Sequence, residues 1–162
     1  AGEDYILFKV EITNNGNSPV QYNYLFGDEP WVGDFGSSDG DIGWSDQGIY
    51  RKHTYLLPSR INFAGIWDRG NDLIGEIPGS YSSYANFIEW LENPPTFVQF
   101  SDDFKRVDEN APLSSKFNRV INLQWLYQIL LPGQSKSYVF AMGMARPDSS
   151  GIPVKPLIKE AY

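Results

Sequence analysis

The chain has 162 residues, of which 41% are hydrophobic and 15% aromatic, and its net charge is −7; these values predict a single domain spanning 1–162 and exclude a largely disordered chain. Because the sequence contains no cysteine, disulfides, thiolate nucleophiles and zinc–thiolate sites are excluded. No apolar run reaches the roughly 18 residues that a membrane-spanning helix needs, so we expect no membrane insertion.

The N-terminal part of the chain predicts two half-buried strands. In 5–13 and again in 20–26, the even-numbered residues are apolar or aromatic, and most residues between them are polar. This period of two is typical of strands with one face on a core. The segment between them, 14–19, is rich in Asn, Gly and Pro, which predicts a turn.

The stretch 27–48 predicts a long loop rich in Gly, Asp and Trp. It holds six glycines, six acids and two tryptophans without a lysine or arginine. Glycine weakens both helix and strand, and the apolar residues keep neither period. Loops longer than about 12–15 residues are uncommon in compact domains and are often functional. The rings of Trp31, Phe35 and Trp44 favour a folded loop over a disordered one.

The charge distribution disfavours nucleic acid as a partner. The loop takes six of the 20 acids and none of the 13 bases, which leaves 14 acids against 13 bases elsewhere. Nearly all excess negative charge therefore lies in one loop. Since nucleic-acid binding depends on Lys and Arg neutralising phosphates, we expect no nucleic-acid partner.

The middle of the chain predicts two strands and one helix. Residues 49–57 and 60–67 indicate strands, and Gly65 interrupts the second as a bulge or a close backbone approach would. In 80–93 the apolar residues Tyr84, Phe87, Ile88 and Leu91 follow a helical spacing, and two prolines come after the segment. This spacing predicts one short helix.

The C-terminal half predicts further strands. Segments 96–101, 119–131 and 137–145 show strand patterns, and a Pro-Gly turn joins the last two. In 119–131 the odd-numbered residues from Ile121 to Ile129 are expected to share one face. The proline-rich tail is expected to add at most an edge strand around 154–158. The whole chain therefore predicts an all-β fold, an antiparallel β-sandwich of about seven or eight strands with one short helix; a barrel is the main alternative.

The acidic loop predicts a calcium site. Calcium takes six to eight oxygen ligands on a tightly turning backbone, and Asp34, Asp39 and Asp41 are the best-placed cluster, with Asp28 and Glu29 as additions. The EF-hand pattern itself is not matched. The alternative is that these carboxylates accept hydrogen bonds from nearby backbone amides and stabilise turns.

The same loop suits sugar recognition. The rings of Trp31, Phe35 and Trp44 could pack on the apolar faces of a sugar, while Asp46 and neighbouring amides bind its hydroxyls. The alternative is that the rings bury the loop against the sandwich.

Catalytic groups are sparse in this sequence. His53 is the only histidine, and no nucleophile elbow accompanies it, so we expect a structural role for His53. Pairs of carboxylates suited to glycoside hydrolysis can be drawn from several acids, but their separation is not visible in the sequence.

The leading hypothesis is a non-catalytic binding or accessory module of an exported bacterial protein, with carbohydrate as ligand and calcium as a structural ion. The composition, rich in aromatics, Asn, Ser and Gly, indicates a secreted, periplasmic or cell-surface location. The chain begins at Ala1, which indicates a processed protein, an excised fragment or a tagged chain. A structural or protein-interaction sandwich of a larger envelope protein is the alternative function, and a carboxylate-based hydrolase is the third.

Overall fold

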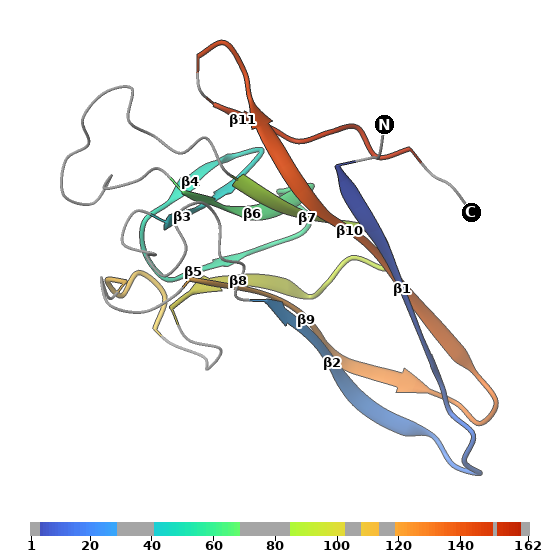
Figure 1. Cartoon of the computed structure of the whole chain (residues 1–162). Coiled ribbons are helices and arrows are strands. Elements are labelled where there is room, and N and C mark those ends of the chain that lie inside the picture. Colours follow the sequence, from blue (N-terminus) through green and yellow to red (C-terminus); the bar gives the residue numbers. More distant parts are fainter. Residues whose placement is uncertain are drawn as a thin grey trace.

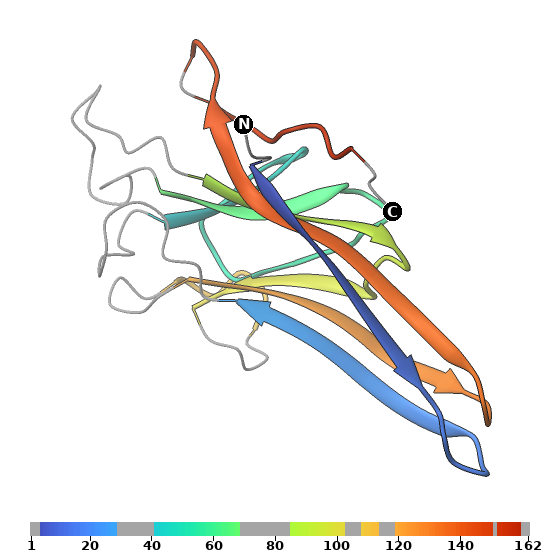
Figure 2. The same cartoon turned by 45° about the vertical axis from the view of Figure 1, so that its right-hand side comes forward.

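The described part of the chain is all β. A computed structural model describes residues 4–28, 41–68, 85–102, 108–113, 119–150 and 152–159. These residues form eleven strands and no helix, and the strands pair in two antiparallel sheets (Figures 1 and 2). The predicted all-β fold with antiparallel sheets is confirmed, although the strand count exceeds the expected seven or eight. None of the described segments is an apolar helix long enough to cross a membrane.

The larger sheet has seven strands in the order β1-β10-β7-β6-β3-β4, and β11 pairs with the end of β10. Its strands are β1 (Tyr5–Thr13), β10 (Ser135–Pro147), β7 (Ala85–Glu92), β6 (Phe63–Asp68), β3 (Asp41–Ser45), β4 (Gly48–Tyr50) and β11 (Pro153–Val154). The smaller sheet has the order β2-β9-β8-β5. Its strands are β2 (Val20–Asp28), β9 (Val120–Leu130), β8 (Phe97–Ser101) and β5 (Thr54–Leu56).

Two turns connect the sheets at one end of the molecule. The chain passes from β1 to β2 through 14–19 and from β9 to β10 through 131–134. Asn14 joins both turns: its backbone exchanges hydrogen bonds with Gln134 and Gly133, and its buried side chain donates to the Leu130 carbonyl at 2.9 Å. These hydrogen bonds tie the two turns to each other at this end of the fold.

The main core lies between the two sheets. Both sheets contribute inward side chains, among them Phe100 and Trp125 from the smaller sheet and Tyr138 and Phe140 from the larger one. The Trp125 and Tyr138 rings meet at 5.1 Å, and both are at most 2% exposed. Each fully buried large apolar side chain contributes about 1.5–3 kcal/mol to folding.

A second core covers the outer face of the seven-stranded sheet. It includes Trp44, Phe63 and Phe87, and Ile158 from the C-terminal tail packs against it. We call residues 152–159 the tail. Because this sheet is covered on both faces, all six residues of β6 are buried.

The helix predicted over 80–93 is wrong. The described part of that segment is strand β7, which lies between β10 and β6. Phe87 and Leu91 point to the outer core, whereas Ile88 and Trp90 point to the core between the sheets. A strand with apolar residues on both faces loses the period of two, and its apolar positions can then mimic helical spacing.

The face predicted for β9 inverts halfway along the strand. Tyr22 and Tyr24 of β2 pair with Gln128 and Trp125, so β9 carries an extra residue at this point. Tyr127 adopts a φ of 55°, and its N–H donates to the Asn23 side chain at 2.8 Å. The bulge turns Tyr127 and Ile129 outward, where they are 74% and 62% exposed, and turns Leu130 into the core.

Candidate functional site

The stretch predicted as one long loop is partly strand. Strand β2 continues to Asp28, β3 spans Asp41–Ser45, and β4 begins at Gly48. The predicted site residues Trp31, Asp34, Phe35 and Asp39 lie outside the described residues. The expectation of a loop over all of 27–48 is therefore wrong for its second part, which forms the β3–β4 hairpin.

Trp44 lies in the middle of β3 with only 5% of its surface exposed. Its indole N–H donates to the Asn86 carbonyl of β7 at 2.8 Å, and its ring meets the Phe63 ring edge-on at 4.7 Å. This hydrogen bond crosses β6 at Gly65, where a side chain would block it: a Cβ there would lie 2.1 Å from the Asn86 carbonyl oxygen and 2.4 Å from the Trp44 indole nitrogen. The predicted close backbone approach at Gly65 is confirmed.

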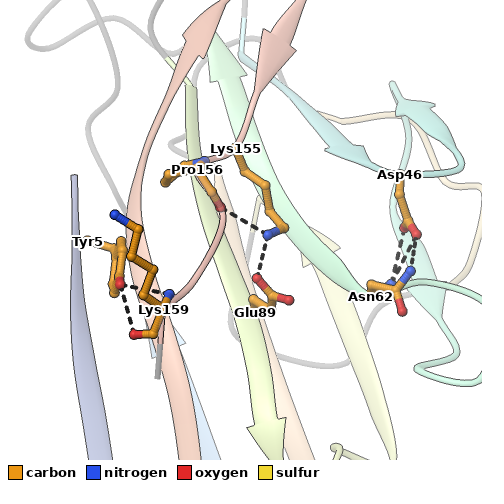
Figure 3. A network of polar contacts seen from close by, with 7 residues as sticks. All are labelled: Tyr5, Asp46, Asn62, Glu89, Lys155, Pro156 and Lys159. Atoms are coloured by element: carbon orange, nitrogen blue, oxygen red, sulfur yellow. Dashed lines mark hydrogen bonds and ion pairs between the residues drawn. The ribbon is translucent and has the colours of Figure 1, made fainter. Parts of the chain in front are cut away.

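Asp46 lies in the turn of the β3–β4 hairpin. Its carboxylate accepts hydrogen bonds from the Asn62 backbone N–H at 3.1 Å and from the Asn62 side chain at 2.6 Å (Figure 3). The neighbouring Ser45 hydroxyl accepts from the Gln47 N–H at 3.0 Å and bonds the Tyr50 hydroxyl at 2.7 Å. The hairpin is therefore held to the 57–62 turn on one side and to its own second strand on the other.

Two predicted calcium ligands, Asp28 and Asp41, stand at strand ends in different sheets. Asp28 ends β2 opposite Ile121, and Asp41 begins β3 opposite Asp68. Within the described ranges, no group of three or more His, Cys, Asp or Glu side chains could hold a metal ion. Calcium in the acidic loop stays a prediction, because the other ligands proposed for it lie outside these ranges.

The β3–β4 hairpin lines a small cavity against the tail, which we call the tail cavity. Its volume is about 260 Å³. Trp44, Asp46 and Phe63 form the sheet side, and Lys155 contributes from the tail. The Lys155 ammonium lies 2.6 Å from Glu89 Oε2 (Figure 3). It also lies 5.8 Å from the ring centre of Phe63 and 5.6 Å from that of Phe87. Four of the eight lining residues, 152–155, belong to the tail, so the tail forms one wall of this cavity.

A larger cleft of about 530 Å³ lies on the other side of the hairpin, where the β4 and β5 edges of the two sheets meet. We call it the edge cleft. Its lining has an aromatic part, an aliphatic part and a polar part. The lining residues are Gln47, Tyr50, Tyr55, Leu56, Leu57, Arg60, Ile61 and Glu109.

The two tyrosine rings of the edge cleft are held in place by their neighbours, and the backbone of Arg60 is fixed by a turn. Tyr50 is fixed by its bond to Ser45, and Tyr55 packs edge-on against Phe97 with ring centres 5.3 Å apart. Arg60 follows a turn closed by its own N–H, which donates to the Leu57 carbonyl at 2.8 Å. Two fixed rings and a cation thus face one open cleft.

His53 lies where the chain crosses from one sheet to the other. Its Nδ1 is 2.8 Å from the Ser101 hydroxyl, and its Nε2 is 3.3 Å from an Asp102 carboxylate oxygen. Its backbone also exchanges hydrogen bonds with Asn110 and Ala111. His53 is 4% exposed and Ser101 is wholly buried, so no substrate can reach that hydroxyl in this conformation. The three groups act as a buried polar link between the crossing segment and the end of β8.

Sequence reasoning missed the edge cleft because 49–57 resembles one continuous strand. In the structure this segment forms β4 in the larger sheet and β5 in the smaller one, with His53 at the crossing. The available signal was the cluster of polar and charged residues around 51–53, which interrupts the apolar pattern. Tyr50 is half-buried and reaches both the core and the cleft.

Comparison of the chain with models of protein families, with curated proteins and with solved structures gave no match. The geometry of the β3–β4 hairpin and its two cavities is therefore the basis for the functional argument.

Proposed function

We propose that this protein is a non-catalytic carbohydrate-binding or accessory module of an exported bacterial protein, and that the edge cleft is its ligand site. The observation that carries the proposal is the pair of fixed tyrosine rings, Tyr50 and Tyr55, in one cleft with the polar groups of Gln47, Arg60 and Glu109. Ligand sites commonly combine an apolar wall with a few placed polar groups.

The chemistry of the lining favours a sugar over a fully apolar ligand. Tyrosine rings pack on the C–H faces of a pyranose, and their hydroxyls, together with Gln47, can bind the sugar hydroxyls. Arg60 and Glu109 are exposed at the cleft. Arg60 adds a preference for a sugar that carries a carboxylate, because a guanidinium binds a carboxylate through two parallel hydrogen bonds.

The site proposed here adjoins the one expected from the sequence. Gln47 belongs to the stretch 27–48, and Trp44 and Asp46 lie on the opposite side of the same hairpin. Recognition by the other aromatic and acidic residues of 27–48, with calcium as a structural ion, belongs to the same proposal. The secreted, periplasmic or surface location belongs to the same proposal and has its basis in composition alone.

Binding to a glycan panel that includes uronic acids, followed by titration calorimetry, tests the proposal. We expect Arg60→Gln and Tyr55→Ala to weaken binding at least about tenfold, which corresponds to about 1.4 kcal/mol. Tyr127→Ala is the matched control, because Tyr127 is 74% exposed and is not part of the cleft lining. Arg60 is exposed, so Arg60→Gln should leave the unfolding transition unchanged.

Calcium is tested separately by thermal unfolding with EDTA, with calcium and with magnesium. A ligand at a hundredfold excess over its Kd stabilises the folded state by about 2.7 kcal/mol. A calcium-specific rise in Tm would favour the ion.

Absence of binding to the whole glycan panel at millimolar calcium would refute the carbohydrate proposal.

A further inference from the structure

Strand β2 forms an open edge of the smaller sheet along its whole length (Figures 1 and 2). Among the described residues it pairs with β9 alone, so its other side presents backbone N–H and C=O groups along a nine-residue strand. An edge of this kind is a template for the addition of another strand.

The other sheet edges are protected in ways that β2 is not. Strands β4 and β5 have three residues each, too few to guide much pairing. Strand β1 is as long as β2 but exposes Lys9 and Glu11, and charged side chains are a common protection of natural edges. Residues 20–27 of β2 contain neither a charged residue nor a proline.

We propose that β2 pairs antiparallel with the β2 of a second copy of this chain, centred on Asn23. In a two-fold pair of antiparallel strands, inward-facing residues must lie opposite inward-facing residues. Because side chains alternate between the two faces, the two-fold axis must then pass through a residue and not between two residues. Two seven-residue windows avoid both Pro19 and Asp28: 20–26, centred on Asn23, and 21–27, centred on Tyr24. We choose the first, because the second ends on Gly27, and glycine weakens a strand. The cross-strand pairs are then Tyr22 with Tyr24, Gln21 with Leu25, and Val20 with Phe26.

These pairs are self-complementary. On the inner side, each copy contributes Tyr22 and Tyr24, and cross-strand aromatic pairs are among the favourable ones in sheets. Tyr24 is already stacked on Trp125 at 4.9 Å, and the Tyr22 hydroxyl bonds that of Tyr138 at 2.6 Å, so the rings are held ready. No pair brings two like charges together.

The outer face beside this edge is apolar and exposed. Leu25, Tyr127 and Ile129 are 53%, 74% and 62% exposed, and all three lie on the outer side of β2 and β9. In the proposed register, Leu25 of one copy lies opposite Gln21 of the other copy. Gln21 is paired with Ile129 of its own chain, so one strand separates Leu25 from the Ile129 of the other copy. The added strand thus brings together two apolar surfaces that water contacts in the single chain.

Charge elsewhere on the chain opposes this association weakly. Each copy has a net charge of −7, with six acids concentrated in 27–48. At physiological ionic strength the screening length is about 8 Å, so repulsion between exposed acids is reduced. We therefore expect salt to strengthen the dimer, the opposite of its effect on an interface held by ion pairs.

Sedimentation equilibrium of the full chain between micromolar and millimolar concentration tests the proposal. We expect a monomer–dimer equilibrium that tightens between about 0.05 and 0.5 M NaCl. The double variant Q21K/L25K places lysines opposite each other twice in the dimer, and its Kd should rise at least about tenfold. Q21E/L25E should dissociate in the same way, and an equimolar mixture of the two variants should form heterodimers.

Two controls separate this interface from any other. Ile6→Lys adds a charge on the β1 edge, where Ile6 is 66% exposed, and should leave the Kd unchanged. Q21K/L25E carries both substitutions with opposite charges and should still dimerise. The proposal is overturned if the chain is monomeric up to millimolar concentration. It is equally overturned if Q21K/L25K dimerises like the unchanged chain, or if the mixture of variants stays monomeric.

Discussion

The larger sheet carries an apolar core on each face, and the two cores are closed in different ways. The core between the sheets is closed by four strands of the smaller sheet, whose backbone hydrogen bonds fix its side chains. The outer core is closed in part by the tail, which has only the two-residue strand β11 and attaches mainly through side chains. This difference predicts that two equally buried side chains, one in each core, differ in the stability lost when they are truncated.

The largest effect that we expect comes from truncating a ring in the core between the sheets. Phe140→Ala should lower the free energy of unfolding by about 3–5 kcal/mol, because Phe140 is wholly buried between two sheets that cannot close over the space. Phe87→Ala, at an equally buried position in the outer core, should cost about 1 kcal/mol less, because the tail can settle into the cavity. Urea unfolding with unchanged m-values checks both.

Equal losses for the two variants would contradict this comparison. They would mean that the tail is as rigid a cover as a hydrogen-bonded sheet.

An intermediate effect should follow from removing the charge that anchors the tail. Lys155→Met keeps the apolar stem beside Phe63 and Phe87 but removes the ion pair with Glu89 and the cation–π contacts. Both side chains of the pair are about one-fifth exposed, so we expect a loss of about 1–2 kcal/mol in urea unfolding.

A double-mutant cycle with Glu89→Gln isolates the pair. If the ion pair stabilises the tail, K155M and E89Q together should cost less than the sum of the two single losses. A K155M variant that is as stable as the unchanged chain would show that the pair only offsets the desolvation of its two charges.

The two cores also explain how much of the fold the sequence revealed. Strand β1 has the predicted bounds, because its polar and apolar residues alternate where one face meets water. Strand β7 was predicted as a helix, because both of its faces are apolar and the period of two disappears. The alternation of polar and apolar residues reflects the contrast between a face on water and a face on a core. A strand with a core on each face has no such contrast, so its sequence does not alternate.

The candidate site shows the same limit in another form. The sequence pointed to the hairpin through Trp44 and Asp46, which do line the tail cavity. It did not reveal the edge cleft, because Tyr50, Tyr55 and Arg60 meet only when the chain crosses between sheets. Composition marks a segment, whereas a cleft between two sheet edges depends on strand order, which no local pattern encodes.

The smallest effect should come from the ion pair that joins the start of β1 to the end of β10. The Arg146 guanidinium binds the Asp4 carboxylate at 2.7 and 2.9 Å and lowers the pKa of that carboxyl below its ordinary value. A lowered pKa in the folded state means that the pair stabilises the fold above the unfolded-state pKa, near 4, and that this contribution fades as the pH falls through the folded-state value. Asp4→Asn should therefore lower Tm slightly at pH 7, with a difference from the unchanged chain that vanishes near pH 2. Because Arg146 is largely exposed, the difference should also shrink in 1 M NaCl. A difference that persists at low pH would instead mean that the introduced amide disturbs the nearby contacts of Tyr5 with Lys159, which secure the tail that closes the outer core.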